Sequence, residues 1–126
     1  MMTQNKVVSK FKKKIFIFDI DNTLCKTTKN FYEKAIPKKK MITLVNKLYK
    51  NGHIIKLFTS RYMGRSNQNV KVVKSRYKKK TENQLKSWGL NYNKLIMGKP
   101  SYDFFVDDKS INPKTVNIYK ILKKFI

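Results

Sequence analysis

The chain has 126 residues, enough for one domain with a hydrophobic core but not for a second domain. Hydrophobic residues make up 40% of the chain, including 8 Phe and 7 Tyr, so the composition favours a globular fold over disorder. All apolar runs are short, so no membrane-spanning helix is expected. The single cysteine, Cys25, excludes an intramolecular disulfide and a cysteine-based metal site, and a cytoplasmic location is the default expectation.

The net charge is the unusual feature of the composition. There are 30 Lys and Arg residues against 7 Asp and Glu residues, giving a formal charge of +23 at pH 7. Such a charge attracts polyanions such as nucleic acid, and it equally suits a solvated basic surface without a function. Few of the basic residues are Arg, the type that recognises phosphate through two hydrogen bonds, which favours the second interpretation slightly.

The first predicted element is a strand at residues 14–19, preceded by a basic tail at residues 1–13. Its centre, Ile15 to Phe18, is β-branched and aromatic, which is typical of a strand buried on both faces of a parallel sheet. Asp19 and Asp21 follow directly. Unpaired carboxylates at the end of a buried strand are costly, and Mg²⁺ is a natural partner because it prefers oxygen ligands.

An amphipathic helix and a second strand are predicted next. From Met41, apolar residues recur at the spacing of one helix face as far as residue 49, and Gly52 is suited to end the helix in the left-handed conformation. Residues 53–58 form the second predicted strand. It is followed directly by three polar residues, Thr59, Ser60 and Arg61.

Two helices are predicted after this strand. The first begins at Ser66 or Asn67 and is interrupted by the lysine run at residues 78–80. The second begins with a capping box at Thr81 and ends at Gly89.

Two further strands are predicted in the last third of the chain. Residues 95–97 form a short strand that leads to Lys99. Residues 103–106 form another, which ends at Asp107 and Asp108. In each case a charged side chain that is able to do chemistry lies at or just beyond the end of an apolar run.

A last helix is predicted after Asn112, an N-cap residue followed by Pro113. Strands that alternate with helices predict an α/β fold, here a three-layer, Rossmann-like parallel sheet with helices on both faces. Residues 14–126 would form this single domain. Ligands of such sheets bind beyond the carboxyl ends of the strands, and the candidate residues are all expected there: Asp19, Asp21, Thr59, Lys99, Asp107 and Asp108.

The candidate residues match the needs of phosphoryl transfer. The reaction requires a nucleophile, a proton donor for the leaving oxygen, a cation to offset charge, and hydrogen-bond donors to the phosphoryl oxygens. Asp19 is the candidate nucleophile and Asp21 the candidate acid and base. Thr59 would supply a hydroxyl and Lys99 a cation. The remaining acids would complete a Mg²⁺ site with Asp19; they are Asp107 and Asp108.

Five stretches of the sequence together resemble the haloacid-dehalogenase-like (HAD) phosphatases. The resemblance is strongest to the small capless hydrolases associated with capsule and lipopolysaccharide sugar biosynthesis, and polynucleotide kinase-phosphatases are a more distant likeness. The stretches are Phe-Asp-Ile-Asp-Asn-Thr-Leu-Cys at 18–25, Thr-Ser-Arg-Tyr-Met-Gly-Arg at 59–65, Gln-Leu-Lys-Ser-Trp-Gly-Leu at 84–90, Gly-Lys-Pro-Ser-Tyr-Asp at 98–103 and Val-Asp-Asp-Lys-Ser-Ile-Asn at 106–112.

The resemblance implies a role for each of these residues. Asp19 would attack phosphorus, and Asp21 would protonate the leaving alcohol and later activate water. Mg²⁺ would be held by Asp19, by the backbone carbonyl of Asp21 and by the last acidic pair. Asp108 would be the direct ligand and Asp107 would act mainly through water, although which of the two binds directly stays open. Predicted substrate contacts come from Thr23, Ser60 and Arg61.

The spacing of the motifs leaves no room for a cap domain. Residues 24–53 and 61–98 hold only a helix or two each, so an open site is expected. An open site suits a large substrate, or a homo-oligomer whose neighbouring subunit serves as a lid. The expected function is a Mg²⁺-dependent phosphomonoester hydrolase that acts on a sugar phosphate or similar metabolite. Two alternatives stay open: a nucleic-acid terminal phosphatase, and a non-catalytic protein of HAD-like fold that binds polyanions.

Overall fold

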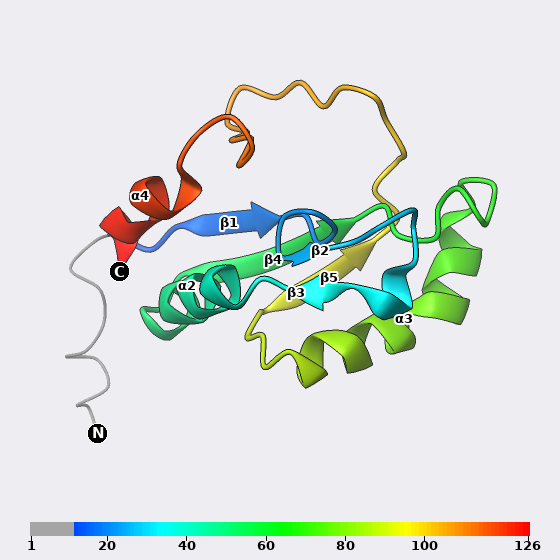
Figure 1. Cartoon of the computed structure of the whole chain (residues 1–126), viewed down its shortest axis with the longest axis horizontal. Coiled ribbons are helices and arrows are strands. Elements are labelled where there is room, and N and C mark those ends of the chain that lie inside the picture. Colours follow the sequence, from blue (N-terminus) through cyan, green and yellow to red (C-terminus); the bar gives the residue numbers. More distant parts are fainter. Residues whose placement is uncertain (1–11) are drawn as a thin grey trace.

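The computed structural model describes residues 12–126, so most of the predicted tail at residues 1–13 lies outside the described residues. Three parallel strands form the central sheet in the order β1-β4-β5, and Figure 1 shows them side by side. The strands are β1 (Ile15–Phe18), β4 (Ile54–Thr59) and β5 (Lys94–Met97). The sheet therefore has the parallel pairing that the alternation of strands and helices predicts.

The hydrophobic core lies against one face of this sheet. Phe18, Leu57 and Leu95 are neighbours across the three strands, and all are buried. On the opposite face, the side chains of Ile15 and Ile17 are 64% and 61% exposed. The prediction that the first strand is buried on both faces is therefore wrong, because an apolar run alone does not show whether both of its faces are covered.

The order of the strands explains why the core is one-sided. The chain moves in one direction across the sheet, from β1 to β4 to β5, and parallel connections are almost always right-handed. Right-handed connections in one direction place their helices on the same face. Figure 1 accordingly shows α2 (Lys39–Lys50) and α3 (Val70–Ser87) on the same side of the strands. Helices on both faces, as the sequence predicted, are not confirmed.

The first helix agrees with its sequence pattern. The apolar stripe of α2 is buried against the sheet, and it includes Met41, Val45 and Leu48. The helix ends at the cap residue Asn51, and Gly52 follows with φ +90°. A residue with a side chain is strained at this angle, so the glycine is required there.

The two helices predicted between residues 66 and 89 are one continuous helix, α3. Its N-cap is Asn69, whose side chain accepts a hydrogen bond from the backbone N–H of Val72. Thr81 does not cap a new helix, because its hydroxyl donates to the carbonyl of Tyr77 one turn earlier. The lysine run does not break the helix, since lysine is a good helix former.

A small antiparallel hairpin follows β1. It pairs β2 (Cys25–Lys26) with β3 (Ile36–Pro37), and the short helix η1 (Tyr32–Lys34) lies between them. The sequence did not predict this hairpin, because each strand has only two residues and no alternating pattern can be recognised over that length. The hairpin folds the connection back towards the end of β1.

The strand predicted at residues 103–106 does not form. Residues 100–112 contain no helix or strand and are exposed throughout, with Phe104 87% and Val106 94% exposed. The prediction was wrong because the apolar run was taken as evidence of a strand, although a strand also needs a pairing partner. Within residues 12–126, β1 pairs with β4 on one side only, and no strand forms hydrogen bonds along its other edge. Figure 1 shows the segment arching away from the sheet.

The last helix begins later than predicted. Asn112 caps a turn, in which its side chain accepts from the N–H of Lys114, and Asn117 is the N-cap of α4 (Ile118–Leu122). A short helix, η2 (Lys123–Phe125), completes the chain. The ring of Phe125 packs against Phe16 on the core face. None of the helices in the described part of the chain is both long and apolar enough to cross a membrane.

Candidate active site

The carboxyl ends of the three parallel strands bring together residues that are distant in the sequence. Asp19 directly follows β1, Thr59 is the last residue of β4, and Lys99 follows β5. The backbone N–H of Lys99 donates to the carbonyl of Thr59 at 3.0 Å, which joins the last two loops. The ammonium of Lys99 lies 3.9 Å from Oδ1 of Asp19. The three strand ends therefore meet at one place, as expected for the ligand-binding edge of a parallel sheet.

Lys99 is held in an unusual position for a lysine. It is only 7% exposed, and its ammonium donates to the hydroxyl of Tyr102 at 3.0 Å. The same ammonium lies 4.8 Å from the ring centre of Tyr102 and 4.9 Å from that of Phe105. These ring contacts favour the cation. The arrangement presents one fixed positive charge to the carboxylate of Asp19.

Gly98 allows this position of Lys99. Its φ is +95°, and a Cβ at this residue would lie 2.8 Å from a methyl carbon of Val70, the first residue of α3. Close approach and a left-handed backbone together exclude a larger residue. The start of α3 therefore fixes the loop that carries Lys99.

Asp19 is the accessible carboxylate of the pair. Its side chain is 31% exposed, which leaves it open to a ligand. Burial raises the pKa of Asp19 above its ordinary value, and the nearby Lys99 opposes this rise. Such a partly desolvated carboxylate beside a cation is suited to nucleophilic attack on an anionic group.

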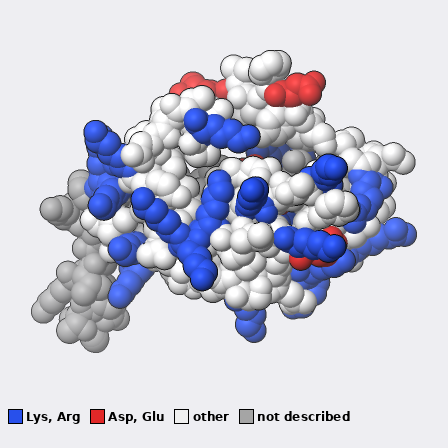
Figure 2. All heavy atoms as spheres, viewed as in Figure 1, with Lys and Arg blue, Asp and Glu red and all other residues white. Residues whose placement is uncertain are grey.

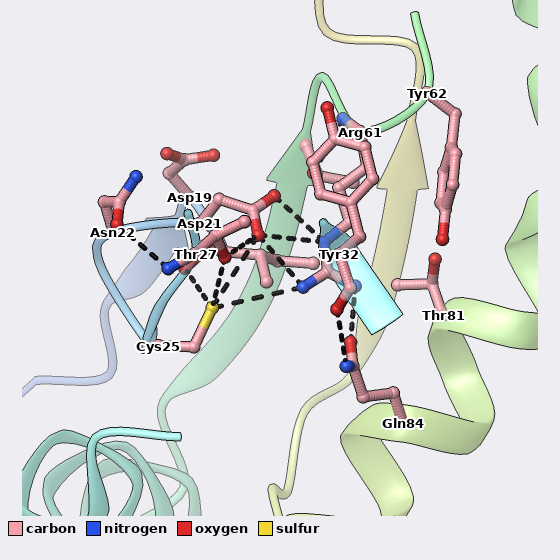
Figure 3. Close-up of polar contacts among 12 residues, drawn as sticks. Asp19, Asp21, Asn22, Cys25, Thr27, Tyr32, Arg61, Tyr62, Thr81 and Gln84 are labelled. Atoms are coloured by element: carbon pink, nitrogen blue, oxygen red, sulfur yellow. Dashed lines mark hydrogen bonds and ion pairs between the residues drawn. The ribbon is translucent and has the colours of Figure 1, made fainter. Parts of the chain in front are cut away.

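Asp21 is bound by the guanidinium of Arg61, as Figure 3 shows. Nε of Arg61 lies 2.9 Å from Oδ2 and 3.1 Å from Oδ1, and Nη2 lies 3.0 Å from Oδ1. The hydroxyl of Thr27 also donates to Oδ1, at 2.5 Å. The second carboxylate is therefore oriented by donors from two loops.

The turn that follows Asp21 is fixed by its own hydrogen bonds. Asn22 has φ 61°, and its side chain accepts from the backbone N–H of Thr27. Burial raises the pKa of the Cys25 thiol, which favours the protonated form, and its Sγ lies 3.7 Å from Oδ1 of Asp21. Cys25 is fully buried, so it acts as a structural thiol of this loop.

Different environments surround the predicted hydroxyl donor Thr59 and the three predicted substrate contacts, Thr23, Ser60 and Arg61. Thr59 is completely buried, and its hydroxyl oxygen accepts from the backbone N–H of Arg61. Arg61 is itself only 2% exposed. Thr23 lies two residues after Asp21 and Ser60 directly follows Thr59, and both are half-buried. The structure thus gives Thr59 and Arg61 partners within the protein, and Thr23 and Ser60 keep partly accessible side chains.

An aromatic cluster flanks the Asp21–Arg61 pair. Tyr62 stacks on Tyr77 of α3, with ring centres 3.9 Å apart and an angle of 4° between the rings. The hydroxyl of Tyr62 donates to Glu33 at 2.9 Å, and Lys80 forms an ion pair with the same carboxylate. These donors lower the pKa of Glu33 to about 2. The cluster joins η1 to α3 next to the site.

The structure does not bring Asp107 and Asp108 to the other acids. Both lie in the exposed segment at residues 100–112. Within residues 12–126 there is no group of three or more His, Cys, Asp or Glu side chains arranged to hold a metal ion. The predicted magnesium ligands are therefore not assembled around Asp19 in this arrangement, because Asp107 and Asp108 lie in the exposed segment.

The sequence predicts a capping-box role for Gln84 and none for Thr27, but both side chains complete the site. Gln84 of α3 accepts a hydrogen bond from Nη1 of Arg61 and donates to the carbonyl of Tyr32 at 2.8 Å. Thr27 binds Asp21 from the hairpin. Both are common polar residues. The only sequence feature that could have pointed to Gln84 is its place at the start of residues 84–90, one of the five stretches that resemble the HAD phosphatases.

Comparisons with known proteins support the fold alone. No family model matches the chain, and no curated protein matches it in sequence. A crystal structure of a structural target from Vibrio cholerae resembles it with a TM-score of 0.75 and 23% sequence identity. The match covers 90% of this chain and 98% of the other. The chain therefore shares an α/β fold with a known structure over nearly its full length.

Proposed function

We propose that the protein is a phosphomonoester hydrolase that acts through an aspartyl-phosphate at Asp19. The observation that carries this proposal is the pair formed by Asp19, which is accessible, and the ammonium of Lys99 at 3.9 Å. A second carboxylate, Asp21, lies two residues away and is fixed in orientation by Arg61. Nucleophile, cation and a further acid are thus gathered at the ligand-binding edge of the sheet.

The proposed reaction has two steps. In the first, an oxygen of Asp19 attacks phosphorus and the bond to the leaving oxygen breaks. That oxygen keeps the electron pair and takes a proton from Asp21, while Lys99 offsets the charge of the phosphoryl group. In the second, water attacks the aspartyl-phosphate, Asp21 accepts a proton from the water, and the bond to Asp19 breaks. Inorganic phosphate is released and both carboxylates return to their starting state.

Magnesium dependence is part of the proposal, and it rests on the sequence pattern. Two pairs of aspartates each follow an apolar run, and Mg²⁺ prefers such oxygen ligands. When bound, the ion would offset phosphoryl charge. The described arrangement does not assemble its ligands, so neither of the two steps above includes the metal. A magnesium role for Asp107 and Asp108 requires the segment at residues 100–112 to move to Asp19.

The test is phosphate release from an aryl phosphate, with and without Mg²⁺. We expect turnover by the wild type, and a loss of roughly 1,000-fold or more in Asp19→Asn, which lacks the nucleophile. Asp103→Asn is the matched control, because Asp103 is exposed and lies outside the site. Equal rates in wild type and Asp19→Asn would contradict the proposal and favour a polyanion-binding protein without catalysis. If turnover depends on Asp19 as expected, a screen of sugar phosphates identifies the preferred metabolite.

A nucleic-acid terminal phosphatase is the second candidate function. The formal charge is +23, and Figure 2 shows Lys and Arg side chains over much of the visible face. Tyr102 and Phe105 flank Lys99 and are 47% and 50% exposed, so nucleic-acid bases could stack on them. This function predicts that oligonucleotides with a terminal phosphate are hydrolysed faster than sugar phosphates, and that the advantage falls with salt. No turnover of such oligonucleotides would exclude it.

A further inference from the structure

We infer that Arg61 is a positioning residue, which holds the carboxylate of Asp21 through a clamp completed by Gln84 and does not bind substrate. The inference rests on the proposed function, because it gives Arg61 a part in the chemistry that Asp21 would perform. It differs from the expectation for Arg61 drawn from its place in the sequence, which was direct contact with the substrate.

The donors of Arg61 are already used within the protein. Its Nε–H is shared between both oxygens of Asp21, and its Nη2 donates to Oδ1 and approaches the thiol of Cys25 at 4.0 Å. Its Nη1 donates to Gln84. A guanidinium has five N–H bonds, and these contacts use four of them. With a side chain only 1% exposed, Arg61 has no free pair of donors for a phosphate.

Two aromatic rings also lie close to the guanidinium. It lies 5.2 Å from the ring centre of Tyr32 and 6.0 Å from that of Trp88. Gln84 is anchored in turn, since its amide donates to the carbonyl of Tyr32. These two rings and the Gln84 amide restrict the movement of the guanidinium. Its Nε and Nη2 donate to the two oxygens of Asp21, so the orientation of the guanidinium also sets that of the carboxylate.

The clamp distinguishes the two oxygens of Asp21. Oδ1 receives contacts from Arg61, Thr27 and Cys25, whereas among the described residues Oδ2 receives one, from Nε of Arg61. An oxygen that already accepts several hydrogen bonds has little capacity to accept or carry a proton. The geometry therefore assigns proton exchange with the leaving oxygen and with water to Oδ2.

The first test separates positioning from substrate binding. We expect Arg61→Gln to lower kcat by about 100-fold and to leave KM within about threefold, because the interaction acts on the chemical step. Arg65→Gln is the matched control: Arg65 is exposed and lies 5.0 Å from the ring centre of Tyr62 in the same cluster. A large rise in KM with kcat unchanged would overturn the inference, since it would show that Arg61 binds substrate.

A double-mutant cycle tests whether Arg61 acts through Asp21. If it does, Arg61→Gln adds little to the loss caused by Asp21→Asn, and the double variant has kcat within about threefold of Asp21→Asn alone. Losses that multiply would overturn the inference while leaving the hydrolase intact. A wild type that releases no phosphate would contradict the proposed function, and with it the role of Arg61.

Variants of Gln84 provide a test that keeps Arg61 in place, should Arg61→Gln fail to fold. Gln84→Leu removes the acceptor for Nη1, and we expect kcat to fall several-fold with KM unchanged. Gln84→Glu restores the acceptor for Nη1 but loses the donor to the carbonyl of Tyr32, so kcat should recover only in part. Asn83→Leu, at an exposed position of the same helix, is the control. Wild-type kcat in Gln84→Leu would overturn the clamp.

Discussion

The loop after β1 and the segment at residues 100–112 each carry a pair of aspartates, but only the first holds them against other side chains. Asp19 and Asp21 have ion-pair partners that come from the ends of β4 and β5. Asp107 and Asp108 are exposed, in a segment with no helix or strand. The difference shows that an apolar run followed by two acids builds a fixed site only where the run is paired within a sheet.

Substitution of Asp108 gives the sharpest contrast between these regions. If the proposed magnesium role holds, Asp108→Asn lowers turnover by roughly 100-fold at limiting Mg²⁺, because a metal supplies several kcal/mol of charge stabilisation. The Tm should not change, since Asp108 is exposed. Parallel assays of Asp107→Asn would show which of the two is the closer ligand. Wild-type Mg²⁺ dependence in both variants would mean that the segment is a surface loop without a catalytic role.

Gly98 lies in the sequence between these two regions, and its substitution should disturb the loop that carries Lys99 to Asp19. Gly98→Ala would place a methyl group 2.8 Å from Val70 at a φ of +95°, so we expect a loss of about 2 kcal/mol in the free energy of unfolding. Gly64→Ala is the control, because a Cβ there meets no atom within 4 Å, and it should change stability by less than about 0.5 kcal/mol. Urea unfolding measures both. Equal stabilities would show that the start of α3 does not fix the Lys99 loop.

The charged carboxylate of Asp19, which the proposed reaction needs, should lower the free energy of unfolding at pH 7. Its pKa is raised above 3.8, so its favourable contribution is present below pH 3.8 and is lost as pH rises through the folded value. At pH 7 the buried charge opposes folding, and Asp19→Asn should raise the Tm by a few degrees, in line with a typical gain of about 1 kcal/mol. The difference should shrink towards pH 3. A lower Tm in the variant would mean that the attraction of Lys99 outweighs burial.

Glu33 should give the smallest effect and the opposite sign. Its pKa is lowered from 4.5 to about 2, so its contribution to stability is present above pH 4.5 and is lost as pH falls towards 2. Its side chain is 41% exposed, so Glu33→Gln should cost less than about 1 kcal/mol at pH 7. Thermal unfolding at pH 7 and near pH 2.5 checks this. A difference in Tm that does not diminish at the lower pH would argue against the ion pair as its cause.

The sequence was sufficient for features set by local pattern. The stripe of α2, the cap at Gly52 and the gathering of Asp19 and Lys99 at strand ends all follow from periodicity and from the geometry of parallel sheets. The burial of Arg61 could not be predicted, because it depends on Gln84, far along the chain. The missing strand at residues 103–106 has a similar cause, since pairing is decided by tertiary contacts.

The most direct test of the central claim is to trap the phosphoryl group on the protein. Wild type and Asp21→Asn would be mixed with an aryl phosphate, quenched in acid, and compared by intact mass and peptide mapping. We expect one added phosphoryl group, located on Asp19 and more abundant in Asp21→Asn, because that variant lacks the base that activates water. A phosphoryl group on another residue, or none during measurable turnover, would contradict nucleophilic catalysis by Asp19.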